Sequence, residues 1–285
     1  MHPVIYLNRT MLAATKARVA PVSSAMLYGR GVFTTVGIYH GKPFLWPEHW
    51  QRLLNHAGRL NIDCSGCTEA GVGEALSKLI TVNNVNNGRA RVILLARSGR
   101  DFWKTKTKAP GAKQTDMLIM TGEAQKVPES GLTLAVSPYR VNTFSPLNGI
   151  RSLNYLEQVL SWEEAQEREF DEAIMLNERG EIAAATMANI FWVKEGTVYT
   201  PALSTGAVAG VTRNTILKLA DQEAIPVVEG VYELGDLVEA DEIFLTSANV
   251  GVALVTTFDF RRYSVEPGSV AVTLRTAFRK LLEAS

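Results

Sequence analysis

The sequence has no long apolar segment and no excess of charge of either sign. No uninterrupted apolar run approaches the roughly 18 residues that a membrane-spanning helix needs. The N-terminal stretch MHPVIYLNRTMLAATKARVA lacks the charged start and long apolar block of a signal peptide. Lys plus Arg number 29, as do Asp plus Glu. These absences argue against nucleic-acid and membrane partners, and we expect a cytoplasmic protein.

Cysteine is also scarce, since the chain has only Cys64 and Cys67, in NIDCSGCTEAG. A structural zinc site would need two further ligands, and a thioredoxin-like motif would need a strand before the pair. Thr68 with Glu69 predicts a helix after the pair, but the end of another helix precedes it. We therefore expect two free thiols in a helix–helix turn and no metal site.

The length of 285 residues fits two domains. The polar stretch 124–131, which contains Pro128 and Gly131, predicts a linker between a domain of residues 1–123 and one of residues 132–285. Residue types and apolar spacing predict the elements within each domain. The main predictions are strands at 4–8, 31–39, 90–98, 116–122, 171–177 and 241–247, a hairpin turning at 195–196, and helices at 47–60, 151–170, 211–225 and 269–284.

Two features could bind a phosphate. In GAVAGVTRNTILKLA, Gly206 and Gly210 loosen a loop that runs into a helix, with Thr212 in its first turn. Free N–H groups at a helix start form an anion site, although an ordinary capped helix has the same pattern. Arg52 projects from the helix at 47–60, and its fork suits phosphate oxygens as well as a solvated or ion-paired role. The tripeptide GRG in YGRGVF runs into a strand and lacks a third glycine, which excludes a Rossmann loop.

Six stretches, taken in order, resemble one family. They are YGRGVFTTVGIYHGKPF, EHWQRLLNHAGRL, SLNYLEQVLSWEEAQEREFDEAIMLNERGEI, ATMANIFWVKEGTVYTP, GAVAGVTRNTIL and DEIFLTSANVGV. In order and spacing they resemble the fold-type IV pyridoxal-phosphate enzymes, the class IV aminotransferase group. This group includes branched-chain and D-amino-acid aminotransferases and 4-amino-4-deoxychorismate lyase. The resemblance covers nearly the whole chain, from Tyr28 to Val255.

The resemblance implies a mixed α/β fold with a small N-terminal α/β domain and a larger C-terminal mixed-sheet domain. It also implies pyridoxal 5'-phosphate (PLP) between the domains, a homodimer, and an amino acid or keto acid as substrate. The residues that match the cofactor-binding positions of the family are Arg52, Tyr155, Val211, Thr212, Ser247 and Ala248.

The first departure from the family is at Arg151. The family places the lysine that forms a Schiff base with PLP three residues before an asparagine, which here is Asn154. A guanidinium stays protonated at any working pH, so Arg151 has no free amine for this step and cannot shuttle a proton as the lysine does. Such proton transfer is worth about 10²–10⁴ in rate. In place of that lysine, Arg151 could act as a fixed cation that contacts the cofactor's phenolate or a carboxylate.

The second departure is Ala184, five residues before Asn189, where the family has the glutamate that pairs with the pyridine nitrogen. Glu181 is near in sequence, but three residues along a strand place it on the opposite face. Either a natural member has given up ordinary transamination or the chain was altered deliberately. A rescue by lysines of the loop DFWKTKTKAPG, Lys104, Lys106 or Lys108, is the less favoured alternative.

Substrate choice is poorly defined by the sequence. Arg97 and Arg100 could bind the carboxylate of an amino acid, keto acid or aminodeoxychorismate, or they could belong to a solvated basic loop. The motif SLNYLEQVL favours the D-amino-acid aminotransferase and lyase side of the family. Two functions remain open: an aminotransferase or lyase with activity lost or altered, and a non-catalytic protein that holds PLP or pyridoxamine phosphate without a covalent bond. A purely structural protein is disfavoured by the matching phosphate-site residues.

Overall fold

The computed structural model describes residues 1–97, 115–128 and 130–284. The chain divides into two compact units, unit 1 with Met1–Ala124 and Ile150–Asn154, and unit 2 with Gln125–Gly149 and Tyr155–Ser285. The segment Ile150–Asn154 groups with unit 1 because Ser152 pairs with Val32 of strand β3 (Gly31–Tyr39).

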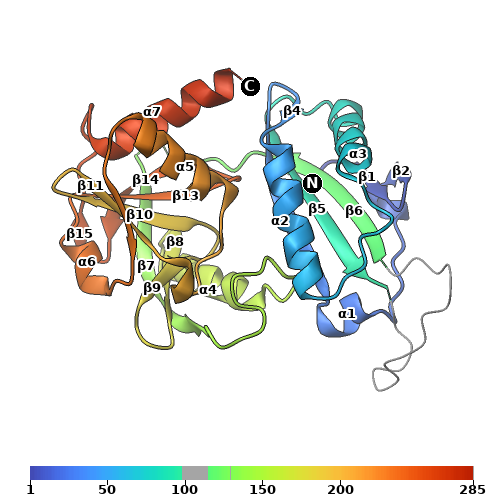
Figure 1. The fold of residues 1–285 in the computed structure, drawn as a ribbon, viewed down its shortest axis with the longest axis horizontal. Helices are drawn as coiled ribbons and strands as arrows, with labels where there is room; N and C mark the ends of the chain where they lie inside the picture. Colours follow the sequence, from blue (N-terminus) through green and yellow to red (C-terminus); the bar gives the residue numbers. More distant parts are fainter. Residues whose placement is uncertain (98–114, 129, 285) are drawn as a thin grey trace. The chain divides into compact units, whose positions relative to one another are not determined.

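Unit 1 is built on an antiparallel sheet whose strand order, among the described residues, is β2-β1-β6-β5-β3-β4 (Figure 1). Helices α2 and α3 pack against this sheet, α2 on β3 and α3 on β1 and β6. Val32, Val36 and Ile38, at alternate positions of β3, are fully buried with Leu53 of α2 and Leu79 of α3, because alternate strand residues face the same side. The other elements of unit 1 are β1 (Val4–Leu7), β2 (Thr10–Ala13), α1 (Ser24–Tyr28), β4 (Lys42–Pro43), α2 (Trp46–Arg59), α3 (Glu69–Val82), β5 (Gly88–Ala96) and β6 (Thr115–Glu123).

Unit 2 is built on a larger mixed sheet with the order β12-β11-β10-β13-β14-β7-β8-β9 and β15 on β14, again among the described residues. Helices α5 and α7 contact each other and β13, while α4 packs on β7 and β8. Its core includes Ile174, Ile190, Trp192 and Leu245. The elements are β7 (Leu132–Val141), α4 (Leu156–Glu167), β8 (Glu172–Asn177), β9 (Ile182–Ala185), β10 (Asn189–Lys194), β11 (Thr197–Pro201), α5 (Val211–Gln222), β12 (Val227–Gly230), α6 (Leu234–Val238), β13 (Glu242–Ser247), β14 (Gly251–Phe258), β15 (Arg261–Arg262) and α7 (Val270–Glu283).

The predicted start of helix α4 is wrong. The sequence predicted a helix over 151–170, whereas α4 begins at Leu156. The N–H of Phe33 donates to the carbonyl of Arg151, and the N–H of Leu153 donates to the carbonyl of Gly31, both at 3.0 Å. These bonds to β3 hold Arg151 and its neighbours in an extended conformation, so the helix starts later.

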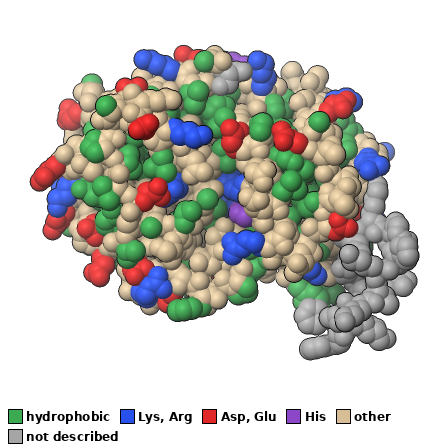
Figure 2. Space-filling model, in the orientation of Figure 1, with side chains coloured by type: hydrophobic (Ala, Val, Ile, Leu, Met, Phe, Trp, Pro, Cys, Tyr) green, Lys and Arg blue, Asp and Glu red, His purple; other side chains and the backbone are tan. Residues whose placement is uncertain are grey.

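The face shown in Figure 2 carries charge of both signs, with Lys and Arg side chains interspersed among Asp and Glu side chains. In the part of the chain that the structure describes, no helix has both the length and the apolarity needed to cross a membrane.

Candidate functional site

One face of helix α2 carries the polar side chains of His49, Arg52 and His56, which have the spacing i, i+3, i+7. His49 and His56 are buried. Thr34 Oγ1 on β3 accepts a bond of 2.9 Å from Arg52 Nη2 and lies 2.8 Å from His49 Nδ1. Because Arg52 supplies the proton of the first bond, the hydroxyl proton of Thr34 can be donated to His49.

Arg151 lies beside this face with its main chain fixed on both sides. Its N–H donates to His56 Nδ1 at 3.2 Å, and its carbonyl accepts from Phe33. The guanidinium carbon of Arg151 lies 6.0 Å from the centroid of the Phe33 ring, and that of Arg91 lies 3.7 Å from the same centroid. Two cationic side chains therefore gather around one aromatic ring, a contact that cation–π attraction stabilises.

The positive charge of this cluster comes from arginine. Burial, together with the nearby Arg52, Arg59 and Arg151, lowers the pKa of His56 to about 4. Burial, followed by Arg52 and Arg151, lowers the pKa of His49 well below its usual value. Both imidazoles are therefore neutral near pH 7. The face of unit 1 around Thr34 combines fixed arginine charge with neutral hydrogen-bonding groups, which suits an anion.

In unit 2, the start of α5 has the features of an anion site. Val211 and Thr212 open the helix and are buried, and among the described residues no side chain caps its first turn at Gly210. Asn189 Nδ2 donates to the carbonyl of Val208 at 2.9 Å, which fixes the loop before the helix. A Cβ at Gly210 would lie 2.2 Å from Asn189 Oδ1, so this close approach requires glycine.

The other residues of unit 2 that were predicted to contact the cofactor also have defined places. Ser247 ends β13, and its Oγ accepts from the N–H groups of Asn249 at 3.2 Å and Val250 at 3.3 Å, which shapes the turn that contains Ala248. The hydroxyl of Tyr155 donates to the carbonyl of Thr186 at 3.1 Å, which holds the ring against the segment after β9. Helix α5 packs on β13 within the same unit.

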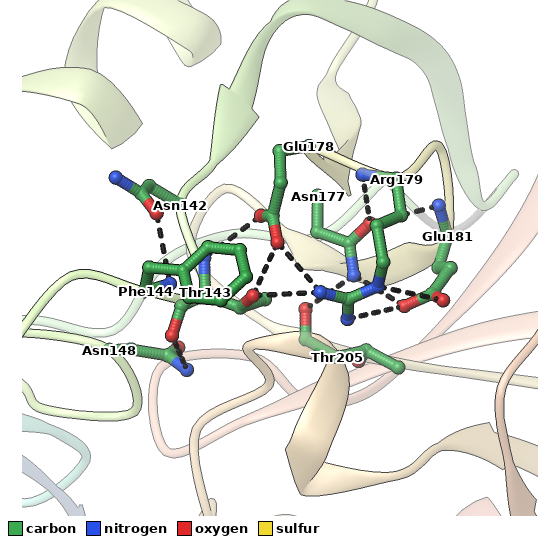
Figure 3. A network of polar contacts seen from close by, with 9 residues as sticks. All are labelled: Asn142, Thr143, Phe144, Asn148, Asn177, Glu178, Arg179, Glu181 and Thr205. Atoms are coloured by element: carbon green, nitrogen blue, oxygen red, sulfur yellow. Dashed lines mark hydrogen bonds and ion pairs between the residues drawn. The ribbon is translucent and has the colours of Figure 1, made fainter.

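Ala184 lies in β9 opposite Met175 of β8 and offers no polar group. The nearby carboxylate of Glu181 accepts from Arg179 Nη2 and Asn177 Nδ2, each at 2.7 Å (Figure 3). Arg179 also pairs with Glu178 in this network. The Glu181 carboxylate is thus engaged at the β8–β9 turn with its own ion-pair partner.

Glu172, at the start of β8, was not singled out from the sequence. Its carboxylate is buried and accepts from the N–H groups of Ala173, Thr186 and Met187 and from the Thr186 hydroxyl. Burial raises its pKa, although these four donors act in the opposite direction. Glu172 lines a cavity of about 200 Å³ within unit 2. The available signal was a glutamate directly before the apolar run AIML of the same strand.

The residues considered for the substrate side are only partly described. Arg97 Nε lies 3.4 Å from Oδ1 of the buried Asp116, which also accepts from Asn8. Arg100, Lys104, Lys106 and Lys108 lie outside the described residues. Carboxylate binding by Arg97 and Arg100 stays a prediction.

Comparisons with known proteins identify the family. The family model for amino-transferase class IV matches residues 31–258. A putative branched-chain-amino-acid aminotransferase of Methanocaldococcus jannaschii is 32% identical over 97% of this chain and 96% of its own length. The aminodeoxychorismate lyase of Bacillus subtilis is 30% identical over 97% of this chain and 94% of its own.

Solved structures confirm the predicted fold. The Escherichia coli branched-chain amino acid aminotransferase superposes with a TM-score of 0.88 at 27% identity, covering 99% of this chain and 95% of its own. A branched-chain aminotransferase from the thermophilic archaeon Thermoproteus uzoniensis, solved with norvaline, superposes at 0.88 with 24% identity, over 100% of this chain and 96% of its own, and shows the fold alone. The chain belongs to the class IV aminotransferase family.

Proposed function

We propose that this chain binds PLP and a carboxylate-bearing ligand but lacks the ordinary covalent step of its family at position 151. The observation that carries the proposal is the hydrogen bonding of Arg151 to His56 and Phe33. The main chain at the position of the family's lysine is held in a defined conformation, yet the side chain is a guanidinium without a free amine. Arginine in place of lysine therefore removes the reactive amine, whereas the main-chain hydrogen bonds that hold residue 151 are present.

The residues fit the phosphate of PLP, but they do not fit its aldehyde carbon and pyridine nitrogen. Of the residues proposed to contact the phosphate, Arg52 lies in unit 1, and the N–H groups of Val211 and Thr212 and the turn at Ser247 and Ala248 lie in unit 2. When bound, PLP supplies an electron sink for bonds at the α-carbon of an amino acid. Neither Arg151 nor Ala184 fits that chemistry, since one has no amine to give and the other no carboxylate for the pyridine nitrogen. We therefore expect non-covalent binding and lost or altered activity.

The ligand class follows from the charge around Phe33. Arg91 and Arg151 place two guanidinium groups over this ring, a setting that favours a carboxylate. An amino acid, a keto acid or an aminodeoxychorismate-like acid carries this group. The curated relatives of the chain include both an aminotransferase and a lyase by name, so both reaction types remain candidates for an altered activity.

A second candidate function is a non-catalytic protein that holds PLP or pyridoxamine phosphate. The favouring observation is that Glu181, the carboxylate next in sequence to Ala184, is engaged with Arg179 and Asn177. Among the described residues, no neighbouring side chain then replaces the amine of the family's lysine or the carboxylate of the family's glutamate. This candidate predicts no half-reaction with any amino acid.

We also propose a homodimer. Val22 and the α1 residues Met26, Leu27 and Tyr28 are each more than half exposed, and clustered apolar exposure is typical of an interface. A second copy of this chain would cover them. Sedimentation velocity should show a dimer that Leu27→Glu weakens, and a monomer at all concentrations would contradict the proposal.

A titration tests the cofactor proposal. PLP binding, followed by its absorbance, should be at least about 10-fold tighter than binding of pyridoxal, because only PLP carries the phosphate. Arg52→Ala should lower PLP affinity about 10–100-fold, whereas Arg59→Ala, at an exposed position of the same helix, should change it little. Equal binding of PLP and pyridoxal, or equal effects of the two variants, would contradict a phosphate site at Arg52.

A further inference from the structure

The two cysteines occupy opposite ends of a single tight turn between α2 and α3. The N–H of Cys67 donates to the carbonyl of Cys64 at 2.9 Å, which closes a four-residue turn. Ser65 N–H donates to Asp63 Oδ1 at 3.0 Å and supports the same conformation. Such a turn brings its first and last Cα atoms within about 7 Å, and a disulfide spans about 4.4–6.8 Å between Cα atoms. The turn therefore holds the two Cα atoms at about the separation that a disulfide needs.

The turn is anchored on both flanks. Arg30 donates to the carbonyl of Leu60 at 3.0 Å and to that of Asn61 at 3.0 Å, at the end of α2. Thr115 Oγ1 donates to the carbonyl of Asp63 at 2.6 Å. On the other side, the side chain of Thr68 caps α3 by accepting from Gly71 N–H. With both flanks held, closing a ring between the cysteines requires rotation of side chains and little movement of the main chain.

The thiols themselves are reduced and half-buried, and both pack against the core of unit 1. Burial, together with the nearby Cys67 and Asp63, raises the pKa of Cys64 to about 11. Cys64 is therefore almost entirely protonated at neutral pH and is a poor first nucleophile, since the thiolate is the reacting form. Any exchange reaction should begin at Cys67.

We propose that Cys64 and Cys67 form a dithiol modification site that closes to an intraturn disulfide by exchange with a low-molecular-weight disulfide such as oxidised glutathione. The Cys67 thiolate attacks one sulfur of the small disulfide and releases one small thiol. Cys64 then gives its proton to solvent, attacks Cys67 Sγ and releases the second small thiol. The protein dithiol is oxidised by two electrons and the small disulfide is reduced to two thiols. The inference does not depend on the proposed cofactor function.

Mass spectrometry of the full chain tests the site. The reduced protein is incubated with oxidised glutathione at pH 8, alkylated with iodoacetamide, and analysed intact and as peptides without reduction. We expect the two thiols to disappear together, with loss of two hydrogens from the intact mass. Peptide mapping should then locate a disulfide between Cys64 and Cys67. Alkylation of both thiols, a lasting glutathione adduct on the unmodified sequence, or a link between two chains would overturn the proposal.

Single variants test the order of attack, and an unfolded control tests the role of the turn. Cys64→Ser should trap glutathione on Cys67, and Cys67→Ser should react more slowly, because Cys64 is the protonated thiol. A faster reaction of Cys67→Ser would contradict the assigned order of attack. The folded protein should close the ring faster than the same chain in urea, because the turn holds the cysteines together. Equal or slower closure in the folded protein would show that the turn does not create the site.

Discussion

The main-chain N–H of Arg151 donates a hydrogen bond of 3.2 Å to Nδ1 of His56, which joins the segment Ile150–Asn154 to helix α2. Nδ1 can accept this bond only while it carries no proton. Burial and the neighbouring arginines lower the pKa of His56 to about 4, so the bond is available at neutral pH. Protonation of His56 at Nδ1 would place its N–H opposite the N–H of Arg151, and this hydrogen bond would be lost.

A pH dependence follows from this pair. Between about pH 6.5 and 4 the unfolded chain protonates His56 while the folded chain does not, so the unfolded state binds more protons and acid favours it. The contribution of His56 to the free energy of unfolding should fall by about 1–3 kcal/mol as the pH decreases through this window. Urea unfolding at several pH values measures it. His56→Gln should flatten the pH profile, and the exposed-site variant His40→Gln should not. Parallel profiles for His56→Gln and the unmodified protein would refute the assignment.

The buried carboxylate of Glu172 should be a major stabilising group of unit 2. Glu172→Ala leaves three N–H groups and the Thr186 hydroxyl without their acceptor, which should lower the free energy of unfolding by about 2–5 kcal/mol. Glu163→Ala, at an exposed position of α4, should change it by less than about 0.5 kcal/mol. Chemical denaturation compares the two, and a loss below about 1 kcal/mol for Glu172→Ala would show that water replaces the carboxylate without cost.

The elements with strong local patterns were predictable, and those set by distant contacts were not. Strand Gly31–Tyr39 and helix α2 follow directly from residue type and apolar spacing. The extended conformation of Arg151 depends on hydrogen bonds to Gly31 and Phe33, which are far away in the sequence, so a helical pattern was misread there. His49 and His56 share a helix face with Arg52, and that spacing could have pointed to them. Thr34 could not have been found, because only strand pairing and the packing of α2 bring it to this cluster.

Gly210 should tolerate no side chain while Asn189 is present. In Gly210→Ala the new methyl group would lie 2.2 Å from Asn189 Oδ1, and the strain should cost about 1–3 kcal/mol. The same change in an Asn189→Ala background should cost less, which thermal unfolding of the double-mutant cycle measures. Gly235→Ala in α6 is the control, since a Cβ there meets nothing within 4 Å. Equal costs in the two backgrounds would contradict the close contact.

On the proposed function, Arg151→Lys combined with Ala184→Glu should restore chemistry if the ligand site is intact. The double change supplies an amine at position 151 and a carboxylate at position 184. With PLP and a set of D- and L-amino acids, we expect the double variant to exceed the unmodified protein in amino-group transfer by at least about 10²-fold. Keto-acid product measures the rate. Equal turnover by the two proteins would contradict the loss assigned to position 151, and an inactive but PLP-binding double variant would show that the substrate site has also changed.

The most direct test of the central claim is reduction of the PLP-loaded protein with borohydride, followed by denaturation and peptide mapping. The account predicts that PLP binds but that no lysine of the unmodified protein acquires its mass, while Arg151→Lys is labelled at residue 151. A label on Lys104, Lys106 or any other lysine of the unmodified protein would show that the covalent step has moved to another residue and is not lost.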